Sequence, residues 1–244
     1  SGHGSIDTAV EATKIGALDF LEKPIPLQKL LQTVERALKQ SETADDKSAV
    51  IEGLGNSAVI QNFNQQIKQA QTHNNAVLLI GETGSPFEII ARFFHKENTP
   101  WVQPTRPEQI IDIPSELLKA TNGVLYLGDI SQSSKNIRQG IAFLTSKADK
   151  HNTRIVFTSS RPLNELLDNS QSDTRLMSVL SSAIINIPAL RQHSEDIPFI
   201  VNKLLNEIAP NRPVKFAASA MNRLRQYDWP GNFEQLKNVV NSLV

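Results

Sequence analysis

The sequence has no cysteine, which excludes disulfide bonds, thiolate metal sites and a cysteine nucleophile. It also lacks an excess of either charge: 25 acidic residues balance 25 basic ones, so no general attraction for nucleic acid or anionic membrane is expected. No apolar run approaches the roughly 18 residues of a membrane-spanning helix, so we expect no membrane partner. Because 39% of the residues are hydrophobic and only 20% are charged, the composition favours a globular chain over a disordered one.

The spacings that mark common metal and hydrolase sites are also missing. The five histidines show neither H-x-x-H nor H-E-x-x-H spacing, and the chain has no G-x-S-x-G nucleophile elbow. We therefore expect no metal site. Scattered serine, histidine and aspartate residues could still meet in the folded chain, and spacing alone does not decide this.

The most informative stretch of the sequence is residues 76–88. Residues 76–80 are apolar and predict a buried strand, a glycine-rich turn follows, and the apolar residues after it predict a helix. A phosphate-binding loop has this order, but it needs the pattern G-x-x-x-x-G-K-[ST]. Here Pro86 stands at the second glycine and Phe87 at the lysine, so the loop has lost its phosphate chemistry. The candidate site consists of Gly81, Glu82, Thr83, Gly84, Ser85, Pro86, Phe87 and Glu88.

Strands and helices are expected to alternate through the middle of the chain. The expected strands are residues 77–80, 101–102, 124–127, 154–158 and 184–187, and helical patterns lie between them. Alternation of this kind predicts a parallel α/β sheet with helices on both faces. From about Leu190 onward the pattern is entirely helical. The G-x-G-x-x-A spacing at 53–58 has no clear strand before it, so a helix is favoured there over a dinucleotide site.

Residues 1–40 contain two candidate helices on either side of a short candidate strand. Two motifs in this segment resemble the C-terminal part of a response-regulator receiver domain. They are Ser-Gly-His-Gly at 1–4 and Gly-Ala-Leu-Asp-Phe-Leu-Glu-Lys-Pro at 16–24. That resemblance implies a switch hydroxyl at Ser1 and a phosphoryl-contacting lysine at Lys23. The alternative is an ordinary helix–strand–helix unit whose strand ends in a lysine. Residues 41–50 lack apolar periodicity and are expected to form a linker.

The rest of the chain resembles the AAA+ bacterial enhancer-binding proteins, the sigma-54-dependent activators. The resemblance rests on Gly-Glu-Thr-Gly at 81–84, Pro-Ala-Leu-Arg at 188–191, Glu-Asp-Ile-Pro at 195–198 and Trp-Pro-Gly-Asn at 229–232. It implies an AAA+ α/β subdomain over 51–189 and a helical lid over 190–244. A receiver followed by this domain is the layout of NtrC-type response regulators, and the receiver-like motifs at 1–4 and 16–24 are most similar to the NtrX branch.

Against that family, the residues that carry ATP chemistry are replaced. The magnesium-holding carboxylate at the end of the third strand is Gly128, with Asp129 one place along, which we interpret as a solvated strand-end acid. The sensor asparagine aligns with Ser160, and the lid arginine aligns with Glu234, a reversal of charge.

Two further features of the family are missing. The positions of the arginine fingers fall on Asp173 and Val179, with Arg175 nearby. The Gly-Ala-Phe-Thr-Gly-Ala loop, which grips the sigma factor in that family, has no counterpart in the short stretch between Val102 and Val124.

These observations predict part of a cytoplasmic two-component transcriptional regulator whose AAA+ domain is a non-catalytic regulatory and oligomerisation module. We expect no cofactor and no metal. The expected partners are a second copy of the chain, and a sensor histidine kinase and DNA, both engaged through parts outside this sequence. The alternative is an ATP-dependent sigma-54 activator whose nucleotide site is rebuilt from other residues.

Overall fold

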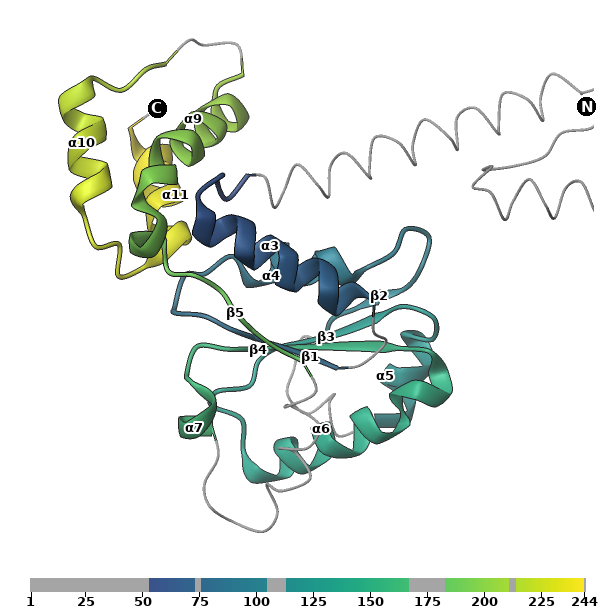
Figure 1. Ribbon diagram of the computed structural model, residues 1–244. Coiled ribbons are helices and arrows are strands. Elements are labelled where there is room, and N and C mark those ends of the chain that lie inside the picture. The colour runs from purple at the N-terminus through teal and green to yellow at the C-terminus, as the bar shows by residue number, and fades with distance from the viewer. Residues whose placement is uncertain (1–52, 73–75, 105–112, 167–182, 211–213, 244) are drawn as a thin grey trace, which may run out of the picture. The chain divides into compact units, whose positions relative to one another are not determined.

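The computed structural model describes residues 53–72, 76–104, 113–166, 183–210 and 214–243 (Figure 1). The chain divides into two compact units, residues 1–49 and 50–244, and every described residue belongs to the second. The predicted receiver segment, with Ser1 and Lys23, and the predicted linker lie outside the described residues, as do the arginine-finger positions Asp173 and Val179.

A five-stranded parallel sheet forms the centre of the described unit, as the alternating pattern predicted. Its strands are β1 (Val77–Ile80), β2 (Trp101–Val102), β3 (Val124–Asp129), β4 (Arg154–Ser159) and β5 (Ile184–Asn186). Their order across the sheet is β2-β3-β4-β1-β5, and all pairs are parallel. The central strands β4 and β1 are buried along most of their length because both of their faces are covered.

Helices cover the sheet on both faces (Figure 1). On one face lie α3 (Ala58–Gln71) and α4 (Phe87–Ala91), and on the other lie α5 (Ile113–Lys119), α6 (Lys135–Ala148) and α7 (Leu163–Leu166). Alternate strand residues point to opposite faces, so Val77 and Leu79 join the core under α3, whereas Leu78 joins the core under α6. The predicted α/β architecture is therefore confirmed.

The C-terminal part of this unit is helical, as predicted, and forms a layer of its own (Figure 1). A 3₁₀ segment, η4 (Leu190–Asp196), leads into α9 (Ile197–Ile208), α10 (Ala218–Gln226) and α11 (Asn232–Ser242). A third core joins these elements and includes Trp229, which is 2% exposed and whose indole Nε1 donates to the Leu224 carbonyl at 2.8 Å. Among the described residues, no helix is long and apolar enough to cross a membrane.

The helical C-terminal layer is joined to the part that contains the sheet at the start of α3. The buried Asp196 carboxylate accepts the backbone N–H groups of Asn56 at 2.8 Å and Ser57 at 3.1 Å. Gly55, with φ +127°, makes this approach possible, because a Cβ there would lie 2.1 Å from the Asp196 Cγ. The glycine spacing at 53–58 therefore serves a helix start and a packing contact, and the favoured helix is confirmed as α3.

Replacing Asp196 with alanine is expected to lower the free energy of unfolding by about 2–3 kcal/mol, because two amide groups would lose a charged acceptor in a buried place. The matched control is Glu195→Ala, which removes the same charge from an exposed neighbouring residue. Urea denaturation followed by circular dichroism measures both variants. Equal midpoints for the two would show that the joint does not depend on this carboxylate.

Candidate functional site

The glycine-rich loop lies between the carboxyl end of β1 and the start of α4, the place where α/β sheets commonly bind ligands. The Gly81 N–H donates to the Ser159 carbonyl at 3.0 Å, which fixes the start of the loop to the central strand β4. Gly84 has φ +80°, a left-handed conformation that favours glycine. The backbone path predicted for residues 77–88 is therefore present.

The loop's own backbone uses the amide groups that a phosphate would need. The Ser85 N–H donates to the Glu82 carbonyl at 3.0 Å, and the Phe87 N–H donates to the Ser85 carbonyl at 2.8 Å. Pro86 has no N–H to offer. Three consecutive positions, 85 to 87, thus present no free amide to an anion.

Phe87, at the position where a phosphate loop carries lysine, is half-buried and packs against the core between α3 and the sheet. The next residue, Glu88, is the acid in the first turn of α4 and forms an ion pair with Arg92 at 2.7 Å. An acid in the first turn stabilises the positive end of a helix. This part of the loop therefore supplies an apolar ring and a carboxylate where a phosphate site needs a cation.

The ends of β3 and β4 hold the remaining sheet positions of the predicted site. β3 extends past the expected end at Leu127, through a bulge, to Asp129: Tyr126 lies opposite Val156, but Gly128 lies opposite Phe157. Gly128 has φ +67°, and a Cβ there would meet no atom within 4 Å. The position where the family has its magnesium carboxylate is thus a left-handed glycine facing open space.

Asp129 and Ser160 are brought together through Ser131. The Ser131 N–H donates to Asp129 Oδ1 at 2.7 Å, and its hydroxyl lies 3.0 Å from the Ser160 hydroxyl. Partial burial raises the pKa of Asp129, but the hydrogen bonds from Ser131 and Ser160 outweigh it, and the net pKa is lowered. Asp129 is exposed, in keeping with a strand-end acid. In the part of the chain that the structure describes, no group of three or more histidine or acidic residues could hold a metal ion.

The lid docks directly on the glycine-rich loop. The Glu234 N–H donates to the Gly84 carbonyl at 3.0 Å, while the Glu234 side chain is exposed. A Cβ at Gly84 would lie 2.0 Å from the Gly231 carbonyl oxygen, so this contact requires glycine. The buried Asn232 donates to the Thr83 carbonyl at 3.1 Å.

Glu82 and Arg191 form an ion pair across the same contact, which the sequence did not reveal. The Arg191 Nη1 donates to Glu82 Oε2 at 2.6 Å and its Nη2 to Oε1 at 2.5 Å, a bidentate arrangement. The hydrogen bonds from Arg191 hold the pKa of the Glu82 carboxyl below its usual value; partial burial opposes this, and Asn232 adds to the lowering. Arg191 and Asn232 belong to the motifs on which the family resemblance rests, but nothing in their spacing indicated a contact with Glu82.

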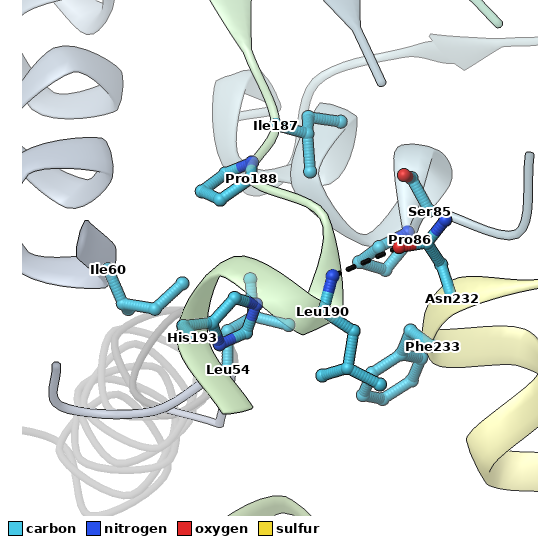
Figure 2. A pocket seen from close by; sticks show the side chains of 10 residues that line it. All are labelled: Leu54, Ile60, Ser85, Pro86, Ile187, Pro188, Leu190, His193, Asn232 and Phe233. Carbon is cyan, nitrogen blue, oxygen red and sulfur yellow. Dashed lines mark hydrogen bonds between the residues drawn. The ribbon is translucent and has the colours of Figure 1, made fainter. Parts of the chain in front are cut away.

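A small pocket lies between the loop, α3 and the lid (Figure 2). Its volume of about 20 Å³ is enough for about one water molecule. Two buried polar groups lie at its walls: the Ser85 hydroxyl oxygen has no hydrogen-bond partner, and His193 Nδ1 lies 3.4 Å from Asp196 Oδ2. Burial lowers the pKa of His193, and the nearby Asp196 carboxylate works in the opposite direction. The pocket is lined by Leu54, Ile60, Ser85, Pro86, Ile187, Pro188, Leu190, His193, Asn232 and Phe233.

Comparison with known proteins gives the same family as the sequence motifs. Residues 54–190 match the model of the sigma-54 interaction domain, and residues 191–244 match that of the AAA+ ATPase lid domain. A putative response regulator NtrX-like of Rickettsia typhi is 30% identical over 281 aligned residues, which cover 98% of this chain and 59% of that protein. The nitrogen assimilation regulatory protein NtrX of Azorhizobium caulinodans is 28% identical and is matched over 63% of its length.

A solved structure with the same fold is NtrX from Brucella abortus in complex with ATP. It is 28% identical and superposes with a TM-score of 0.71, covering 100% of this chain and 62% of that one. The chain thus spans about three-fifths of the length of these relatives. By its matched domains the chain belongs to the sigma-54 interaction domain family of AAA+ proteins, with the lid domain of that family at its C-terminal end.

Proposed function

We propose that this chain is part of a two-component transcriptional regulator in which the AAA+ domain is a non-catalytic regulatory and oligomerisation module. The proposal rests on one observation, which is how the backbone groups and side chains of the glycine-rich loop are occupied. Its amides at 85 and 87 are bonded within the loop, its lysine position is Phe87, and its Gly84 carbonyl accepts an N–H from the lid.

Phosphoryl transfer depends almost entirely on positioning and on stabilisation of negative charge. The magnesium carboxylate is replaced by Gly128, and the lid arginine is replaced by Glu234, whose carboxylate would repel a triphosphate. Arg191 brings a positive charge near the loop, but this charge is already paired with Glu82. Little remains in this site to stabilise a transferring phosphoryl group.

The relatives support the regulatory part of the proposal. Response regulators named NtrX, ZraR and NtrC all match 98% or more of this chain. In this proposal a sensor kinase and DNA are engaged through other parts of the full protein, and the receiver segment with Ser1 and Lys23 supplies contacts to a second copy. Its apolar stripe over residues 27–38 would normally lie on a receiver sheet and needs a cover.

The alternative, an ATP-dependent sigma-54 activator with a rebuilt site, is favoured by one observation. NtrX from Brucella abortus, 28% identical, was solved in complex with ADP and with ATP. In this chain, a rebuilt site would have to open the contact between the lid and Gly84 and place new cations around the phosphates. Nucleotide binding is therefore the property that separates the two functions.

We expect no binding of Mg·ATP at millimolar concentration and no hydrolysis, because neither lysine nor magnesium carboxylate is present. Isothermal titration calorimetry and thermal unfolding of the 244-residue chain measure this, with Brucella abortus NtrX as the positive control. A dissociation constant one hundred times below the ATP concentration would stabilise the chain by about 2.7 kcal/mol. A shift of that size would refute the non-catalytic function and support the alternative.

Restoring the lysine alone, with Phe87→Lys, is expected to leave ATP turnover undetectable, since Pro86 and Gly128 are unchanged. The triple variant Phe87→Lys, Pro86→Gly and Gly128→Asp is expected to bind ATP more tightly than the single variant. Ile89→Lys, which adds the same charge at a 38% exposed position of α4, is the control. Calorimetry and phosphate release separate binding from turnover, and turnover by Phe87→Lys alone would contradict the proposed loss of the magnesium site.

We also expect that the full-length protein does not open sigma-54 promoters, because the loop that grips the sigma factor has no counterpart in the sequence. The aligned length is consistent with such a loss: the match to the Rickettsia typhi protein extends over 281 aligned residues, although this chain has 244. In vitro open-complex formation with this protein as sole activator is the measurement. Strand opening at such a promoter would contradict the expectation; promoter occupancy without opening is the predicted result.

A further inference from the structure

The lid is attached to the glycine-rich loop by groups of the protein itself. Asn232, whose side chain is buried, accepts the Leu190 N–H with Oδ1 at 3.0 Å and donates to the Thr83 carbonyl with Nδ2 at 3.1 Å (Figure 2 shows the first bond). Its Nδ2 also lies 3.3 Å from Glu82 Oε2. One amide group thus connects the start of α11, the start of the lid and the loop.

Glu82 receives donors from two separate parts of the lid. Arg191 comes from η4, at the beginning of the lid, and Asn232 comes from the first turn of α11. A bidentate guanidinium–carboxylate pair has both geometric specificity and added strength. Because both partners are nearly half exposed, at 44% and 46%, dissolved salt can weaken the pair.

We propose that the Glu82–Arg191 pair is a salt-sensitive latch that keeps the lid closed on the glycine-rich loop without any bound ligand. The latch fixes Gly84 against Gly231 and lets the first turn of α11 close the loop. The ion pair thus adds, within the chain itself, to the Asn232 hydrogen bonds that hold the lid on the loop. The latch shares its site with the proposed function, but it is tested in the absence of nucleotide.

The Glu234 amide is a direct reporter of closure. Glu234 is the third residue of α11, and amides in the first turn of a helix have no acceptor within that helix. Its acceptor is the Gly84 carbonyl, at 3.0 Å in the loop. Its protection from hydrogen exchange therefore requires a docked lid.

The experiment is native-state hydrogen exchange by NMR on the 244-residue chain without nucleotide. Glu82→Gln and Arg191→Gln are each expected to lower the protection of the Glu234 amide by about fivefold, as expected for the loss of an exposed ion pair. Glu88→Gln is the matched control, because it breaks a pair with Arg92 of similar exposure, 48% and 52%, that does not touch the lid. The exchanged pair Glu82→Arg with Arg191→Glu is expected to restore protection.

Two measurements keep the test decisive if a variant loses stability. Amides of the central strand β4 serve as an internal reference, since their loss of protection reports unfolding of the whole unit. In the unmodified chain, raising the salt concentration is expected to lower protection at Glu234 while leaving β4 unchanged.

A Glu234 amide that exchanges freely in the unmodified chain would overturn the latch. So would equal protection in Glu82→Gln and Glu88→Gln, or protection that does not respond to salt. ATP binding seen by calorimetry would overturn the proposed function and leave the exchange result standing, so the two failures are distinguishable.

Discussion

The side chain of Asn232 is the constraint on which the arrangement of the lid depends. A buried amide has one oxygen acceptor and one NH₂ donor group, and both are occupied here, by the Leu190 N–H and by the Thr83 carbonyl. Asn232 also has φ +47°, a left-handed conformation that asparagine tolerates better than most residues. Leaving buried polar groups unpaired is costly, so any movement of α11 away from the loop must break these bonds together. The start of α11 and the glycine-rich loop therefore behave as one piece.

The residues at positions 86, 87 and 128 each satisfy the local structure of the fold. Proline suits the beginning of a helix, where its missing N–H is not needed, and Pro86 directly precedes α4. Phe87 adds apolar area to the core between α3 and the sheet, which lysine could not do. Gly128 takes a left-handed conformation at the bulge of β3, where an aspartate would be strained. These three residues are thus compatible with the fold at the positions they occupy.

Much of the fold could be predicted because its signals are local. The apolar runs of β1 and β4 are read directly from neighbouring residues, and each strand was found within a residue of its expected bounds. The contacts that close the site are not local. Glu82 and Arg191 are 109 residues apart, and nothing in either segment indicates its partner. The bulge between Tyr126 and Gly128 was missed for the same reason, because it depends on the register of β3 against β4.

The glycines of the loop show why a motif and its chemistry must be judged separately. In a phosphate loop, glycine lets the backbone wrap around an anion. Gly84 belongs to the Gly-Glu-Thr-Gly motif on which the family resemblance rests, but here a side chain would collide with the Gly231 carbonyl, so the glycine is required by the lid. Gly55 is likewise required by the Asp196 carboxylate, although its spacing resembles a dinucleotide site. A retained glycine therefore reports a close backbone approach, and only the groups around it identify the approaching partner. At Gly84 those groups are the Gly231 carbonyl and the Glu234 amide, both from the chain itself.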